Sequence, residues 1–161
     1  MSPILNLLVV CASLGTDPVA IEPVYQNYNR AWEVAKAEKL PILVIINPGQ
    51  GDQSGPGRVQ LDDLQRSQHR RNLLQRYIVV MVDASTPHGA EVQKLFKATA
   101  LPRVSVIDRN QSVVMHKTSD KLSMEDWTLL LEKHRTGDYV PPPVKVDYSN
   151  CPSCQQAAMR F

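Results

Sequence analysis

An apolar run at residues 42–46, followed by a glycine-rich loop, constrains the fold more than any other feature of this sequence. The run reads Ile, Leu, Val, Ile and Ile, which predicts a strand buried on both faces in the middle of a sheet. The loop at residues 48–57 contains four glycines and neither Cys nor His. In open α/β sheets, ligands bind at the carboxyl ends of the strands, so we expect the functional site near this loop.

The composition is that of a globular protein and excludes several function classes. The chain has 161 residues, of which 43% are hydrophobic and 21% charged. A net charge of +2 is too small to favour nucleic acid, and 6% aromatic residues argue against a base-stacking surface. No apolar run is long enough to cross a bilayer, so the sequence predicts no transmembrane segment. It also predicts no metal site and no cofactor, and it leaves the oligomeric state open.

The N-terminus has two interpretations. Residues 4–12 are apolar, and the following Ser13-Leu14-Gly15 is a small-x-small site that a signal peptidase accepts. Against a signal peptide, no Lys or Arg precedes the run and Asn6 interrupts it, which favours a first strand or a docked segment. Residues 8–11 also resemble a bacterial lipoprotein site, although the residue before the Cys is bulky. If residues 1–15 are a signal peptide, we expect a bacterial protein that is exported to the periplasm or cell envelope, and otherwise a cytoplasmic one.

The spacing of apolar residues predicts an alternation of helices and strands. The expected helices cover residues 25–39, 59–64 and 68–75, a stretch starting at 85–87 and closed by 98–102, and a last stretch from Ser123 to Gly137. The expected strands cover residues 41–47, 77–83, 103–108 and 112–117, the last two forming an antiparallel hairpin.

This pattern specifies the buried faces of two helices, and it places the histidines at the surface. In the fourth helix, we expect Val92, Leu95 and Phe96 to face the core. In the last helix, the expected buried residues are Trp127, Leu130 and Leu131. Histidines are expected at the surface; they are His69, His88, His116 and His134.

This order of elements resembles the thioredoxin-like family from about residue 25 to residue 135. Three segments carry the resemblance: the stretch at 31–44, which reads A-x-x-x-A-K-x-x-K-x-P followed by apolar residues, the apolar run ending in Asp at 77–83, and Leu101-Pro102 before a strand and hairpin. The resemblance implies an α/β thioredoxin-like fold, with a central mixed β-sheet of four to five strands flanked by helices and an extended C-terminal tail. It also implies that the Leu101–Pro102 bond is cis.

The same resemblance implies protein or peptide clients. An extended client would lie between the glycine-rich loop and the proline, at Gly49, Gly51, Leu101 and Pro102. The sequence departs from the family where the family has its reactive Cys pair, because residues 47–54 contain no Cys. The redox activity of the fold is therefore not carried over to this loop.

The chain is expected to divide into an N-terminal segment at 1–23, a thioredoxin-like domain at 24–137, and a Pro-rich linker and tail at 138–161. The tail contains Cys151-Pro152-Ser153-Cys154, which has the spacing of a dithiol. Such a pair is incidental, a redox or structural disulfide, or half of a zinc site. Zinc normally takes four ligands, and nothing in the His spacing indicates that a second pair converges.

Three functions remain open from the sequence. The first is a non-catalytic, peptide-binding or redox-associated module. The second is a thiol–disulfide oxidoreductase in which Cys151 attacks and Cys154 resolves the mixed disulfide. The third is a dimer bridged by zinc through the tails of two chains.

Overall fold

The computed structural model describes residues 24–49 and 57–142. The candidate signal peptide with Cys11, the loop residue Gly51, and the tail pair Cys151 and Cys154 lie outside the described residues. The described helices are α1 (Tyr28–Glu38), α2 (Leu61–Gln65), α3 (Gln68–Leu74), α4 (Pro87–Leu95) and α5 (Met124–Lys133). The strands are β1 (Ile42–Asn47), β2 (Ile78–Asp83), β3 (Arg103–Ile107) and β4 (Val114–Thr118).

The strands form a mixed sheet in the order β2-β1-β3-β4. β1 pairs in parallel with β2 and antiparallel with β3, and β3 pairs antiparallel with β4. Every residue of β1 is buried, as expected for a strand with neighbours on both sides and helices on both faces. The prediction of a buried middle strand is confirmed, and residues 50–56 of the loop that follows it lie outside the described residues.

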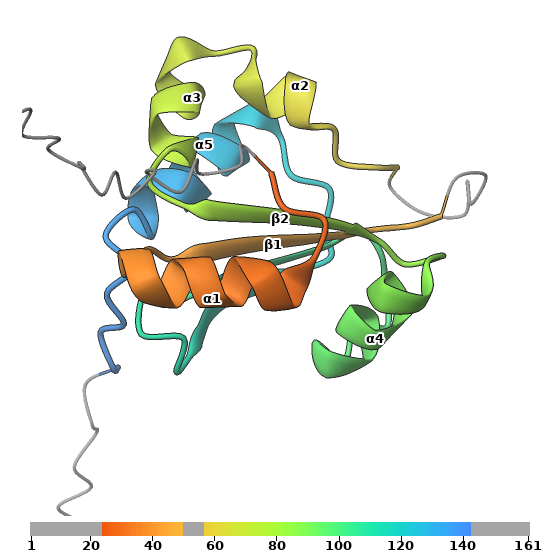
Figure 1. Ribbon diagram of the computed structural model, residues 1–161. Coiled ribbons are helices and arrows are strands. Elements are labelled where there is room, and N and C mark those ends of the chain that lie inside the picture. The colour runs from red at the N-terminus through yellow and green to blue at the C-terminus, as the bar shows by residue number, and fades with distance from the viewer. Residues whose placement is uncertain (1–23, 50–56, 143–161) are drawn as a thin grey trace, which may run out of the picture.

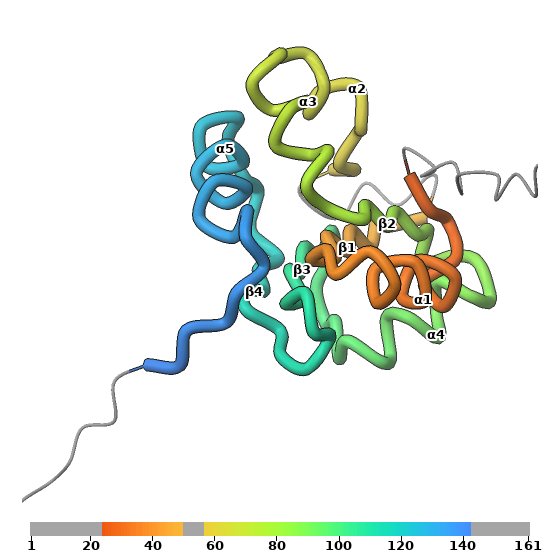
Figure 2. Tube along the Cα trace, turned by 60° about the vertical axis from the view of Figure 1, so that its left-hand side comes forward, coloured from red at the N-terminus to blue at the C-terminus, as the bar shows by residue number. Residues whose placement is uncertain are grey.

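Helices cover the sheet on both faces. Figures 1 and 2 show α1 and α4 on one face and α2, α3 and α5 on the other. Side chains of a strand point alternately to the two faces, so Ile42, Val44 and Ile46 pack with the first group of helices. Leu43 and Ile45 pack with the second group. The described residues therefore contain two cores separated by the sheet.

Helix α1 begins three residues later than the sequence predicted. Tyr25 forms a parallel bridge with Val80, and its N–H donates to the carbonyl of Val79. Asn27 then caps the helix, because its side-chain oxygen accepts the N–H of Arg30 at 3.1 Å. The Asn in this position is the start signal that the periodicity alone did not reveal.

Two predictions of burial are wrong. Leu95 is 63% exposed, because α4 packs on β1 and β2 through Val92 while Leu95 lies at the rim of an open cavity. His134, which follows the last residue of α5, is only 9% exposed, and its ring lies 5.8 Å from that of His116 on β4. The burial of Trp127, Leu130 and Leu131 in α5 is as predicted.

Both ends of α5 follow the sequence. Ser123 and Asp126 form a reciprocal capping box at its start. Gly137, with a φ of +69°, turns the chain after the last residues of α5, a conformation that favours glycine.

In the described part of the chain, no helix has the length and apolar character needed to cross a membrane.

Candidate functional site

The carboxyl ends of β1 and β2 meet the start of β3 at one edge of the sheet. Asn47, the last residue of β1, is buried and holds the segment that enters α2. Its side-chain amide donates to the carbonyl of Val59 at 3.0 Å and accepts the N–H of the same residue at 2.9 Å. A side chain that pairs with both backbone groups of one residue fixes the position of that segment relative to the sheet.

A second clamp joins the two stems of the glycine-rich loop. The Arg58 guanidinium donates to the carbonyl of Pro48 at 2.6 Å and to the Asp83 carboxylate at 2.7 Å. Residues 48 and 58 lie on either side of the loop, so this contact holds its two ends together. The loop therefore leaves the sheet from a base with fixed geometry.

The Asp83 carboxylate also organises the turn after β2. It accepts the hydroxyl of Ser85 at 2.5 Å and the Ser85 N–H at 2.9 Å, in addition to the Arg58 contact. These hydrogen bonds, with that of the Ser85 hydroxyl the largest contribution, lower the pKa of Asp83 to about 2. Asp83 is therefore ionised at neutral pH and serves as an anchor, with no proton to offer as a general acid.

The Leu101–Pro102 peptide bond is cis, as the resemblance implied. Pro102 lines a cavity of about 130 Å³ on the α5 face of the sheet. Buried side chains of Leu64, Val104 and Trp127 contribute apolar surface to it. Gly57 and Arg58 border the cavity from the loop side, and Met124 from the start of α5.

Backbone groups beside this cavity have no partner in the described chain. Within residues 24–49 and 57–142, no hydrogen bond uses the N–H or the carbonyl oxygen of Leu101. Leu101 directly precedes the proline that lines the cavity, and the ladder between β3 and β1 begins only at Arg103. An apolar cavity thus adjoins one backbone donor and one acceptor.

The structure brings together only part of the predicted site. Pro102 and the end of the loop at Gly57 line one cavity, whereas Gly49 lies on the β2 side, with Ser85 as its neighbour. Sequence reasoning missed Asn47, Arg58 and Asp83. The signal for two of them was present, because Asn47 and Asp83 are the polar residues that end the two buried runs.

The described residues offer no sulfur chemistry and no metal cluster at this edge. The three Cys of the sequence are at positions 11, 151 and 154, all outside the described ranges. Among the residues described, no group of three or more His, Cys, Asp or Glu is placed to hold a metal ion.

Comparison with solved structures identifies the architecture. A thioredoxin from Thermus thermophilus is similar with a TM-score of 0.54 and 14% sequence identity, over 68% of this chain and 84% of that one. The chain has a thioredoxin-like fold. At this level of identity, the similarity to that thioredoxin shows the fold alone.

Two further structures are similar at lower scores. The DsbH oxidoreductase has a TM-score of 0.49 and 17% identity, over 83% of this chain and 94% of that one. A disulphide isomerase from Xylella fastidiosa Temecula1 has a TM-score of 0.48 and 19% identity, over 65% of this chain and 86% of that one. No sequence-family model and no curated protein sequence matches the chain.

Proposed function

We propose that this thioredoxin-like domain is a binding module for extended segments of other proteins. Its site would be the peptide groove, defined as the cavity lined by Pro102 and Met124 together with the free backbone groups of Leu101. The observation that carries the proposal is this juxtaposition of an apolar cavity with an unpaired backbone N–H and carbonyl. An extended peptide supplies the complementary pair of backbone groups, as in β-strand addition.

The size of the cavity supports a side chain over a whole small molecule. Its volume of about 130 Å³ is well below the roughly 300–1,000 Å³ of drug-sized ligand pockets. The cavity holds one apolar side chain of a peptide, while neighbouring peptide residues stay outside. Its lining includes Arg58, Asp63, Asp120 and Lys121, and the mixture of both signs selects against neither acidic nor basic clients.

The proposal is tested by blocking the groove from α5. Met124 is 37% exposed and borders the cavity, whereas Leu129 on the same helix is 64% exposed and does not. We expect Met124→Trp to weaken binding of a fluorescein-labelled Ser/Thr decapeptide with one central Leu by at least about tenfold, measured by fluorescence anisotropy. The matched control Leu129→Trp should bind like the wild type.

A second arm of the same experiment tests the backbone pairing. Replacing the two residues beside the central Leu of the peptide by Pro removes their N–H groups, so binding should weaken while the apolar side chain is retained. Equal affinity of the wild type and Met124→Trp for the original peptide would show that the groove is not the binding site.

The alternative proposal is a thiol–disulfide oxidoreductase that acts through the tail pair. It is supported by the Cys-x-x-Cys spacing of Cys151 and Cys154 and by the absence of any other Cys after residue 11. The thiolate of Cys151 would attack a client disulfide, releasing one client thiolate, and Cys154 would then displace the client from the mixed disulfide. The products are a reduced client and an oxidised Cys151–Cys154 disulfide.

Insulin reduction separates the two proposals. The assay measures insulin reduction with dithiothreitol as the electron donor. If the wild type catalyses this reaction and Cys151→Ser does not, the protein is an oxidoreductase and the purely binding role is removed. Slow and unselective alkylation of both thiols near neutral pH would count against the oxidoreductase, because a reactive thiol has a lowered pKa. Intact mass after alkylation, with and without reduction, reports the state of the pair.

A further inference from the structure

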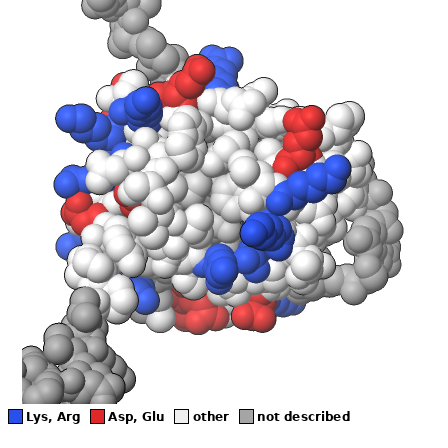
Figure 3. All heavy atoms as spheres, turned by 90° about the horizontal axis from the view of Figure 1, so that it is seen from below, with Lys and Arg blue, Asp and Glu red and all other residues white. Residues whose placement is uncertain are grey.

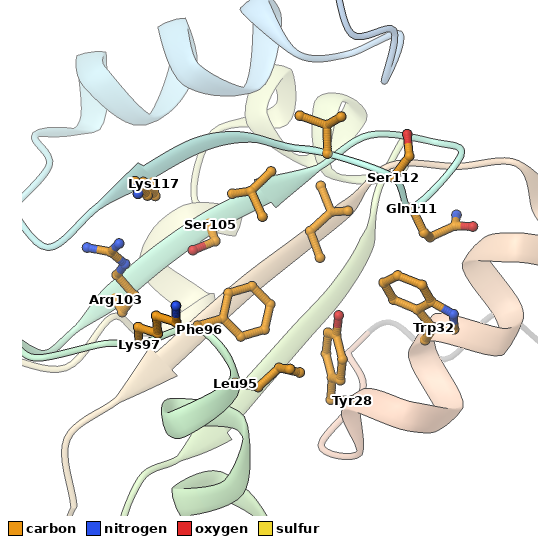
Figure 4. Close-up of a pocket in the computed structure, with 13 residues that line it drawn as sticks. Tyr28, Trp32, Leu95, Phe96, Lys97, Arg103, Ser105, Gln111, Ser112 and Lys117 are labelled. Carbon is orange, nitrogen blue, oxygen red and sulfur yellow. The ribbon is translucent and has the colours of Figure 1, made fainter.

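A second cavity lies on the opposite face of the sheet from the peptide groove. It has a volume of about 290 Å³ and lies between α1, the end of α4, and the strands β3 and β4. Because α1 and α4 pack on β1 and β2, this half of the sheet has no helix over it among the described residues. We call it the β3–β4 pocket, and Figure 4 shows its lining.

Aromatic rings form one wall of the β3–β4 pocket. The ring of Tyr28 lies 5.5 Å from that of Phe96 in an edge-to-face arrangement and 5.9 Å from that of Trp32. Leu95 and Val114, which are 63% and 46% exposed, also line it. This wall offers apolar contacts to a flat ring system.

Basic side chains form the other side of the pocket, and no acidic side chain lines it. Lys97, Arg103 and Lys117 line the pocket, and none of its lining residues is Asp or Glu. Within the described residues, none of the three has an ion pair with a carboxylate. Figure 3 shows a row of basic side chains beside a wide area without charge, with acidic side chains near the row but outside the lining of the pocket. Such a local excess of positive charge attracts an anion.

Two buried polar atoms of β3 lack partners in the same place. Ser105 is 1% exposed, and its hydroxyl makes no hydrogen bond in the described chain. The Nε of Arg103 is likewise buried and unpaired, although its Nη1 donates to the Ser119 hydroxyl at 3.2 Å. Figure 4 shows both side chains on the pocket side of β3. Buried polar groups are normally paired, so these two indicate a missing acceptor.

We propose that the β3–β4 pocket binds a small aromatic acid. Its flat ring would lie against Tyr28, Trp32 and Phe96, and its carboxylate would accept hydrogen bonds from Arg103 and Ser105. A guanidinium can donate two parallel hydrogen bonds to one carboxylate, and its Nε–H can be one of the two donors. Lys97 and Lys117 add attraction at the rim. This site is separate from the peptide groove and does not depend on it.

The alternation of residues along β3 explains why one strand serves both sites. Val104 and Val106 point to the α5 face, and Val104 lines the peptide groove. Arg103 and Ser105 point to the other face and line the β3–β4 pocket. The turn after β3 closes one end of this pocket, because the Asp108 carboxylate accepts the N–H groups of Ser112 and Val113.

Titration with 2-naphthoate, followed by ¹H–¹⁵N NMR of the full chain, tests the proposal. We expect saturable binding with a Kd on the order of 0.1–1 mM and shifts centred on the Trp32 indole and the Ser105 amide. The uncharged analogue 2-naphthalenemethanol should bind at least about tenfold more weakly, because it lacks the carboxylate. Equal affinity for the two compounds, or no saturable binding of 2-naphthoate up to 10 mM, would overturn the proposal.

Three variants locate the site. Arg103→Gln should weaken 2-naphthoate binding about tenfold and Lys97→Gln about threefold. Lys94→Gln is the matched control, since Lys94 also lies near the end of α4 but does not line the pocket, and it should bind like the wild type. If Lys94→Gln and Lys97→Gln weaken binding equally, the attraction is a general effect of charge and the assigned site is wrong. Circular dichroism confirms that each variant is folded before its affinity is compared.

Discussion

The β3–β4 half of the sheet is closed on one face and open on the other. On the α5 face, Trp127, Leu130 and Leu131 cover it and are buried. On the α1 and α4 face, the same strands expose a pocket lined by Arg103, Ser105 and three aromatic rings. The difference is that β3 is a core strand on one side and lines a pocket on the other, because its residue types alternate with the faces.

The largest expected effect comes from removing a side chain on the closed face. Leu131→Ala should lower the free energy of unfolding by about 2–5 kcal/mol, because Leu131 is fully buried and its removal leaves a cavity. Leu95→Ala, at the rim of the open face, should change it by less than about 0.5 kcal/mol. Urea denaturation followed by circular dichroism measures both. Similar losses for the two variants would mean that Leu95 packs as tightly as Leu131 and that the open face is closed.

Removing the N-terminal cap of α5 or of α4, which lie on opposite faces of the sheet, should cause a loss of stability of intermediate size. Ser123→Ala removes the capping box of α5, and Thr86→Ala removes the hydroxyl that accepts the Gly89 N–H of α4 at 3.0 Å. Each should cost about 1 kcal/mol, since each leaves a helical N–H without its acceptor. The Ser123→Ala loss should be the larger, because Asp126 also loses its position in the reciprocal bond. A larger loss for Thr86→Ala would contradict this order.

The smallest expected effect depends on pH and belongs to the closed face. Burial, followed by the charges of Lys133 and Arg103, lowers the pKa of His116. Burial, followed by His116 and Lys133, lowers the pKa of His134. Both rings bind protons more weakly in the folded state than in the unfolded state. The contribution of the neutral pair to the free energy of unfolding is therefore fully present above the ordinary histidine pKa of about 6.5, and it is lost as the pH drops below that value.

Chemical denaturation at pH 8 and pH 5 measures this dependence. The wild type should lose more stability between these pH values than the variant with His116→Gln and His134→Gln, whatever the stability of that variant at pH 8. An equal pH dependence of the two proteins would show that the pair is not the source.

Much of the closed face could be predicted from the sequence. The five-residue apolar run of β1 specifies a central strand, and Ser123 with Asp126 specifies the start of α5. These features are local, so a single segment contains all the information that is needed. That the Leu101–Pro102 bond is cis followed from the resemblance of the whole order of elements.

The open face could not be predicted in the same way. Ser105 looks like an ordinary strand residue, and only the lengths and positions of α1 and α4 show that its face lacks a covering helix. The approach of His116 to His134 likewise joins two elements 18 positions apart through packing that no local spacing encodes. The exposure of Leu95 has the same origin, because its helical spacing fits a core position and only the tertiary arrangement leaves it uncovered.

Hydrogen exchange at the Leu101 amide tests most directly the proposal that the peptide groove pairs with an extended chain. This N–H has no partner in the described chain, so it should exchange fast in the free protein. We predict that a saturating amount of the Leu-containing decapeptide slows its exchange at least about tenfold, both in the wild type and in the variant with Cys151→Ser and Cys154→Ser. An unchanged exchange rate at Leu101 while the peptide is bound, or protection that is lost with the two Cys, would contradict the account.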